Sequence, residues 1–368
     1  MTLEGLAREP AQREQVEKSE VPHVETNFER ATNPFARIVI WGVERIWTSK
    51  LHKLRTKDAR LNEAQKEFRN DTLSDILAEE GRRCGVEHVT IPSSESIFIV
   101  DTASLTDVFK SKREKQAEDL MPSMKAPPPA ALAGFGRFAA VDASRVLDAA
   151  KAHGVAVSTV LSHLLIHEQI HNAAFLKQPN SVFGQSELQS GVSVMPEGSG
   201  DVLFVLLNEG VTELEARRVY KEYATRTGHA GDAQRYIDIL EKGDIYQEAV
   251  TFVRMLSRFL GEEWGVPEDV VEQGFIRAAF RGLRFDRGPM AEALVDLFGP
   301  GFMRHIGTLK NSDKIKSLFE KWRTNVIVHA ALAGGNMQEA FKRGKAIARL
   351  QELMNETTHE RTQEGTQT

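Results

Sequence analysis

The sequence predicts an α+β fold that is predominantly helical, and three observations support this class. Apolar residues recur at helical spacing over residues 33–80 and over most of the chain after residue 140. Short β-branched runs at residues 87–92, 96–101 and 191–195 are typical of strands, and we expect them to form one small sheet. The chain has 368 residues, of which 41% are hydrophobic, so it can bury a large core without disulfides.

The chain divides into regions that differ in composition and in hydrophobic periodicity. Residues 127–129 are three consecutive prolines, which do not fit inside a helix or a central strand. Both ends are polar and lack periodicity, which is typical of disorder. We therefore expect a disordered leader at 1–30, an N-terminal helical region with strands at 31–118, a Pro-rich linker at 119–134, a central domain at 135–310, C-terminal helices at 311–354 and a disordered tail at 355–368.

Within the central domain, local signals indicate where helices begin and end. Asp142 is a candidate N-cap for a helix that stops at Gly154. Ser158 is a candidate cap for a longer helix that runs to about Leu176. Further helices are expected at residues 201–223, 244–260 and 267–282.

Composition excludes several classes of protein. With 47 basic against 52 acidic residues the net charge is −5, which disfavours a dedicated nucleic-acid binder. The single cysteine, Cys84, excludes an internal disulfide framework; its basic neighbours can lower the pKa of its thiol, but a lone thiol is more often inert. No apolar run approaches the roughly 18 residues of a membrane-spanning helix, and the first residues do not form a Sec signal peptide. We expect a soluble protein with no membrane partner, cytoplasmic unless another route exports it.

The residues His167-Glu168-Gln169-Ile170-His171 carry the strongest chemical signal. On a helix, His167 and His171 share one face about 6 Å apart along the axis, so both imidazoles can reach one zinc ion. Glu168 lies where its carboxylate can hold a metal-bound water without binding the ion. Shuffling a chain of this composition yields about 0.03 such motifs, and the alternative is two surface histidines on an amphipathic helix.

A third histidine extends the series but does not fit the same ion. His163 and His171 lie about 12 Å apart along a helix, whereas two ligand atoms of one zinc lie about 3–3.5 Å apart. His163 can support the site only from behind the ligands, and a partly buried histidine without such a role is the simpler interpretation.

A third ligand must come from elsewhere, because catalytic zinc sites have three protein ligands and an open position. The metzincin pattern is excluded, since Ala174 and Lys177 stand where that pattern has Gly and His. Glu209 and Glu213 lie downstream at i, i+4 on one predicted helix face. One carboxylate can bind the metal while the second accepts the free N–H of a ligating histidine; a solvated acidic stripe is the alternative.

HExxH followed by Asn208-Glu209-x-x-x-Glu213 resembles the gluzincin metallopeptidases, the thermolysin-like group. The resemblance covers about 50 residues. It implies a zincin-like catalytic domain at 135–310, Zn²⁺ bound by His167, His171 and Glu209, and Glu168 as general base. It places Glu213 where the family has a supporting acid, often Asp, and the gap from His171 to Glu209 is longer than in thermolysin. A peptide or protein substrate is implied.

Other side chains are candidates for binding the substrate. All four tyrosines and one histidine follow the expected ligand helix, and they are candidate donors to a tetrahedral oxyanion: Tyr220, Tyr223, His229, Tyr236 and Tyr246. Among them we favour Tyr246, although an ordinary role in amphipathic packing is the better explanation for each one taken singly. Arg217, Arg218 and Arg226 can bind a substrate carboxylate or remain solvated, and the 96–101 strand can pair with an extended substrate if it is an edge strand.

The sequence thus favours a zinc-dependent peptidase of unknown oligomeric state. One alternative is a zinc-binding regulatory or interaction domain without catalysis, which peptide hydrolysis lost on chelation would exclude. The other is a helical scaffold with a fortuitous HExxH, which stoichiometric zinc in the purified protein would exclude.

Overall fold

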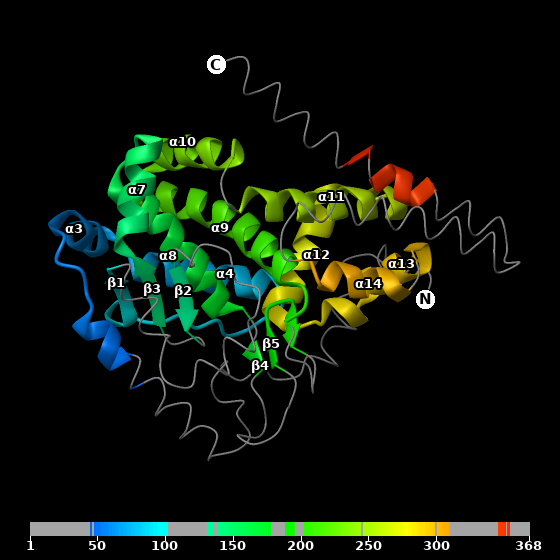
Figure 1. Ribbon diagram of the computed structural model, residues 1–368, viewed down its shortest axis with the longest axis horizontal. Helices are drawn as coiled ribbons and strands as arrows, with labels where there is room; N and C mark the ends of the chain where they lie inside the picture. Colours follow the sequence, from blue (N-terminus) through cyan, green and yellow to red (C-terminus); the bar gives the residue numbers. More distant parts are fainter. Residues whose placement is uncertain are drawn as a thin grey trace, which may run out of the picture.

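Helices make up most of the described structure, as the sequence predicts, and two small sheets complete it (Figure 1). The computed structural model describes residues 45, 48–101, 131–134, 138–174, 176–177, 188–195, 202–243, 246–298, 300–309, 345–350 and 352–353. The helices are α3 (Ala59–Glu67), α4 (Asn70–Arg83), α7 (Ala143–His153), α8 (Val157–Ala173), α9 (Val205–Thr227), α10 (Ala230–Glu241), α11 (Gln247–Trp264), α12 (Glu268–Arg281), α13 (Pro289–Phe298) and α14 (Pro300–Gly307). The strands are β1 (Ile97–Val100), β2 (Ala131–Gly134), β3 (Phe138–Asp142), β4 (Leu176–Lys177), β5 (Leu188–Ser190) and β6 (Ser193–Met195).

The first sheet has the order β1-β3-β2, with β1 parallel and β2 antiparallel to β3. Side chains alternate between its faces, as a pleated sheet requires. Ile97 and Ile99 of β1 belong to the main core, whereas Phe98 and Val100 pack with Leu51 in a smaller cluster on the other face. This sheet therefore has apolar side chains on both faces.

Two expectations about this sheet are wrong. Residues 87–92 form no strand; the Pro92 carbonyl instead accepts hydrogen bonds from the side chains of Asn70 (3.1 Å) and Gln169 (3.4 Å). The strands β2 and β3 were not expected, and β2 occupies the last four residues of the expected linker, 131–134. The rest of that linker lies outside the described residues.

The expected 191–195 strand belongs to a second sheet and does not join the first. Its order is β4-β5-β6, all antiparallel. β4 includes Leu176, so the long helix expected to reach that residue ends earlier, at Ala173. The structure therefore contains two small sheets where the sequence predicts one.

The helix α8 is buried on nearly all sides. It packs against α3, α7, α9 and the strands β2 and β3. The Asp142 side chain caps α7 by accepting from the backbone N–H groups of Ser144 (2.9 Å) and Arg145 (3.3 Å), and α7 ends at Gly154 with φ +61°, both as predicted. The α8 helix begins at Val157 without a side-chain cap, so the expected cap at Ser158 is wrong.

The helix α9 crosses the middle of the molecule and contacts α4, α8, α10, α11 and α12 (Figure 1). It starts after Phe204, whose backbone is left-handed (φ +62°) and whose N–H donates to the Gly307 carbonyl at 2.8 Å. At Gly210 a Cβ atom would stand 2.3 Å from the Ala249 carbonyl oxygen, so only glycine allows α11 to approach this closely.

One hydrophobic core joins regions that the sequence analysis had assigned to separate units. It contains Leu61 and Ile76 from the expected N-terminal region, Leu165 from α8 and Leu353 near the C-terminus. The expected leader 1–30 and tail 355–368 lie outside the described residues, as do the C-terminal positions 311–344. Of the helices in the described part of the chain, none has the length and hydropathy needed to cross a bilayer.

Candidate metal centre

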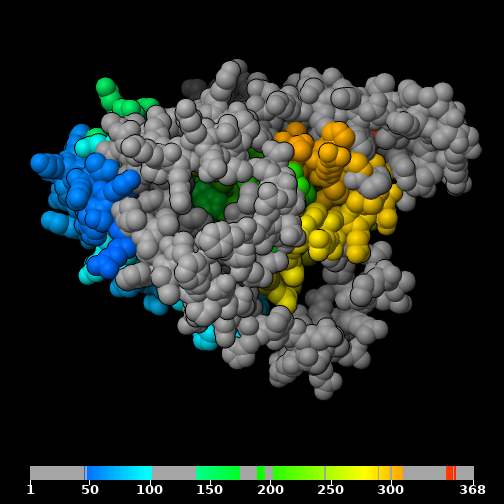
Figure 2. Space-filling model, turned by 60° about the horizontal axis from the view of Figure 1, so that its bottom comes forward, coloured from blue at the N-terminus to red at the C-terminus, as the bar shows by residue number. Residues whose placement is uncertain are grey.

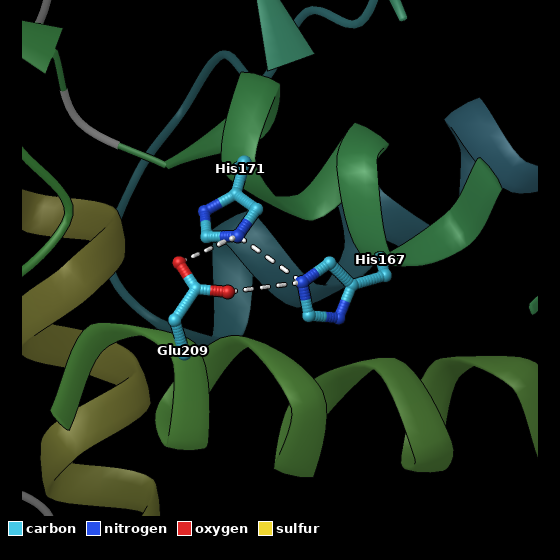
Figure 3. Close-up of side chains that lie close together, drawn as sticks. All are labelled: His167, His171 and Glu209. Atoms are coloured by element: carbon cyan, nitrogen blue, oxygen red, sulfur yellow. Dashed lines mark hydrogen bonds and ion pairs between the residues drawn. The ribbon is translucent and has the colours of Figure 1, made fainter. Parts of the chain in front are cut away.

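Three predicted ligand side chains come together between α8 and α9 (Figure 3). His167 Nε2 lies 3.2 Å from His171 Nε2, and each of these nitrogens lies 3.5 Å from an oxygen of Glu209. Two ligand atoms bound to one tetrahedral zinc lie about 3–3.5 Å apart, because each bond is about 2.0–2.2 Å long. The donor set and its spacing therefore fit a zinc ion.

The second nitrogen of each histidine meets a side chain of α9. His167 Nδ1 lies 2.9 Å from Glu213 Oε2, and His171 Nδ1 lies 3.4 Å from Thr212 Oγ1. These contacts hold both rings with Nε2 toward Glu209, which is the orientation a metal requires. Sequence reasoning identified Glu213 and missed Thr212, although its place three residues after Glu209 puts it on the same helix face.

Glu213 is fully buried and connects several side chains behind the ligands. Its Oε1 accepts a hydrogen bond from Arg217 Nε at 2.7 Å and lies 3.2 Å from His163 Nε2. Arg217 also donates through Nη1 to Gln247 Oε1 at 2.6 Å. His163 is thus excluded from the ligands, as the helix geometry predicts, and it lies behind them, between Tyr220 and Tyr236.

Mutual interactions perturb the ionisation of these groups. Burial opposes the charged form of His167, but hydrogen bonds to Glu209 and Glu213 outweigh burial and raise its pKa to about 10. Burial acts to raise the pKa of Glu209, yet the charges and hydrogen bonds of His171 and His167 hold that pKa far below its usual range. Because zinc binds neutral imidazole and the pKa of His167 is raised, metal binding here would release a proton from His167.

Glu168 is 4% exposed and follows His167 on α8. Its charge acts to raise the pKa of His167, the residue before it. Within the described residues, the group of ligand atoms that lie within 4.8 Å of one another contains His167, His171 and Glu209 but not Glu168. This placement is compatible with the role of a base beside the ion.

Tyr246 is the one expected oxyanion donor that contacts a ligand in the described structure. Its ring centroid lies 4.6 Å from that of His167, with the rings inclined by 32°. Tyr220 and Tyr236 flank His163, and the Tyr223 hydroxyl accepts a hydrogen bond from the Arg69 N–H at 2.7 Å. The remaining candidate, the exposed His229, precedes α10.

The three candidate substrate arginines all make internal ion pairs. Arg217 pairs with Glu213, Arg218 with Glu80 and Glu215, and Arg226 with Glu79 and Glu222. Each of the three arginines is therefore already paired with a carboxylate of the protein itself.

The site opens toward one face of the molecule. Glu209 has 32% of its side chain exposed and His171 has 14%, whereas His167 and Glu213 are sealed. In Figure 2, atoms with the green colour of the chain around α8 and α9 are visible near the centre of the face shown. An ion in this place would be reachable on the side of Glu209 and His171.

The geometry defines a candidate His₂Glu metal centre with an accessible side. A scan against protein families and searches of curated proteins and of solved structures find no match to the chain. The assignment of a function therefore depends on the site itself.

Proposed function

We propose that this protein is a zinc-dependent peptidase of gluzincin type with a zincin-like catalytic domain. One observation carries the proposal: His167, His171 and Glu209 direct three ligand atoms at one point, while Glu213 and Thr212 meet the opposite nitrogens of both histidines. Accidental clustering of an HExxH helix with an acidic helix does not require this second set of contacts.

Each residue near the ligands has a place in amide hydrolysis. Held by His167, His171 and Glu209, a zinc ion would lower the pKa of a water molecule and polarise the scissile carbonyl. Glu168 would accept a proton from the attacking water and return it to the leaving amine. Tyr246, whose ring lies against that of His167, is the proposed donor to the oxygen on which negative charge would develop.

An extended peptide is the substrate that the neighbouring sheet favours. The strand β2 pairs only with β3 within the described residues, and it packs against α8, the helix that holds both histidines. An edge strand next to the catalytic helix can pair with a substrate backbone. Residues 96–101, which contain β1, were the strand expected from sequence to take this role. It is β2, however, that packs closely against α8.

A zinc site without catalysis is the alternative, and the ligand count argues against it. Structural zinc sites have four protein ligands, whereas catalytic ones have three and leave a position open. In the described part of the chain the cluster has three ligands and an exposed side.

The test measures zinc content and peptide cleavage together. Wild-type protein should contain one zinc and cleave members of a mixed peptide library, and a chelator should abolish cleavage. Glu168→Gln should retain zinc and lose about 10²–10⁴-fold in rate, because an amide cannot accept the proton. Glu209→Ala should lose zinc. Glu263→Gln, at an exposed position of α11, is the matched control and should behave as wild type.

Two results would contradict the proposal. Glu168→Gln protein that cleaves as fast as wild type would exclude this mechanism even with zinc bound. If zinc-loaded wild type cleaves no peptide, the assignment of a metal centre stands but the assignment of peptidase activity is wrong.

A further inference from the structure

A chain of buried polar contacts extends from the metal centre to the start of α11. His167 contacts Glu213, Glu213 accepts from Arg217, and Arg217 donates to Gln247. All four residues are at most 5% exposed. Glu209, Glu213 and Arg217 follow one another at i, i+4, i+8, so one face of α9 holds both the ligand and its supports.

The two oxygens of Glu213 have different partners. Oε2 faces His167 Nδ1 at 2.9 Å, and Oε1 accepts from Arg217 at 2.7 Å. The carboxylate cannot turn away from His167 without breaking its bond to Arg217. A buried carboxylate also requires a counterion, and in the described structure Arg217 is the arginine that pairs with it.

The guanidinium is itself fixed. Gln247 Oε1 accepts from Arg217 Nη1 at 2.6 Å, and Gln247 is the first residue of α11. Tyr246, the residue before it, lies against the His167 ring. The start of α11 thus contacts the centre twice, directly through Tyr246 and indirectly through Arg217.

We propose that Arg217, held by Gln247, is a positioning residue of the metal centre: it fixes Glu213 so that His167 presents its Nε2 atom to the ion. This inference rests on the metal-binding part of the proposed function and is independent of hydrolysis. It assigns to Arg217 a task different from the one considered from sequence, which was to bind a substrate carboxylate.

The neighbouring residue provides a matched control. Arg218 is also paired with buried glutamates, Glu80 and Glu215, but these lie toward α4 and do not contact the ligands. Replacing either arginine by methionine leaves a buried carboxylate without its cation. Both variants should therefore lose stability, but only Arg217→Met should alter metal binding.

The experiment measures the zinc Kd of the full chain by competition with a chromophoric chelator, and the absorption spectrum of the Co²⁺-substituted protein. Arg217→Met should raise the zinc Kd about 10-fold or more and alter the Co²⁺ spectrum, as changes behind metal ligands do. Arg218→Met should leave both unchanged. If Arg217 acts through Glu213, the Kd of Glu213→Gln/Arg217→Met should equal that of Glu213→Gln alone.

Three outcomes would overturn the inference: an unchanged Kd in Arg217→Met, an equal rise in Arg218→Met, or independent effects in the double variant. If Arg217→Met does not fold, Gln247→Met is the deciding variant, because it leaves the Arg217–Glu213 ion pair intact and removes the oxygen that accepts from Arg217 Nη1. Its Kd should rise, and an unchanged Kd overturns the inference. If wild-type protein binds no zinc, both proposals are wrong. If it binds zinc but hydrolyses no peptide, only the proposal of peptidase activity is wrong.

Discussion

Asn208, Glu209 and Gly210 are consecutive residues, and each meets a different part of the molecule. Asn208 Oδ1 accepts from the Val192 N–H at 3.0 Å in the turn between β5 and β6. Glu209 faces the histidines of α8, and Gly210 allows the close approach of α11. The first turn of α9 therefore joins a sheet, a candidate metal site and a helix, which explains the local Asn-Glu-Gly sequence in physical terms.

Thr212 supports His171 with a neutral and longer contact than the one Glu213 makes to His167. Thr212→Val preserves shape and removes the hydroxyl, so we expect zinc to bind less than about 10-fold more weakly, a smaller effect than that of Glu213→Gln. The control is Thr225→Val, on the same helix, where the hydroxyl bonds only to the Lys221 carbonyl. A titration of each variant with zinc against a chelator checks this; a larger loss in Thr212→Val than in Glu213→Gln would contradict it.

The ligand candidates could be predicted from sequence because the geometry of a single helix determines most of their arrangement. His167 and His171 need only helical spacing, and Glu209 needs only a second helix that packs against the first. Contacts between helices that no motif marks could not be predicted, because they depend on packing. The contact between Arg217 and Gln247 is of this kind, and nothing in the spacing of these residues indicates it.

Among the secondary-structure elements, boundaries with a local cause were predicted and those that depend on tertiary pairing were not. The start of α7 at Asp142 and its end at Gly154 each have such a cause, a side-chain cap and a left-handed glycine. The strand β2 consists of alanine, leucine and glycine, without the β-branched residues that mark strands. Pairing with β3 makes it a strand. Residues 87–92 have the composition of a strand but no partner for one in the described structure.

The contact between α9 and α11 can be tested at Gly210. In Gly210→Ala the new methyl group would stand 2.3 Å from the Ala249 oxygen and 2.6 Å from Val253 Cγ2, so the helices must separate. We expect a loss of about 1–3 kcal/mol in the free energy of unfolding, together with weaker zinc binding, because Glu209 is the adjacent residue. The control is Gly231→Ala in α10, where a Cβ atom meets nothing within 4 Å. That change should be neutral or stabilise by up to about 1 kcal/mol. Urea denaturation measures both, and equal stability of Gly210→Ala and wild type would contradict the close approach.

Across the whole molecule, a second buried polar cluster joins α4 to α9 away from the ligands. Arg218 pairs with both Glu80 and Glu215, and each glutamate is 1% exposed. Cys84 lies in the same region, and burial together with the charge of Glu80 raises the pKa of its thiol to about 12. The basic neighbours of Cys84 in sequence therefore do not lower the pKa of its thiol, and the folded protein disfavours the thiolate.

Glu215 makes folding stability depend on pH. Burial raises the pKa of Glu215 to about 7 despite Arg218, whereas in the unfolded chain its pKa has the ordinary glutamate value of 4.5. Between these values the folded state binds more protons than the unfolded state, so this residue's contribution to stability is greatest below pH 4.5 and decreases as pH rises to 7. Between pH 5 and pH 8, the free energy of unfolding of zinc-free wild type should fall by about 2 kcal/mol relative to that of Glu215→Gln. Urea denaturation at several pH values measures this difference. The exposed Glu263→Gln serves as control, and a difference that does not change with pH would contradict the assignment.

The contact between Phe204 and Gly307 has a consequence for the order in which the protein is made. The first turn of α9, which carries Glu209, begins at a left-handed residue whose N–H is bonded to the Gly307 carbonyl. A ribosome releases the HExxH helix and α9 long before it releases residue 307. Until then the strained backbone of Phe204 lacks this partner, and strain of this kind costs about 1–3 kcal/mol. We therefore expect the ligand set to assemble only after most of the chain has emerged, so that a nascent chain has no complete centre with which to bind metal.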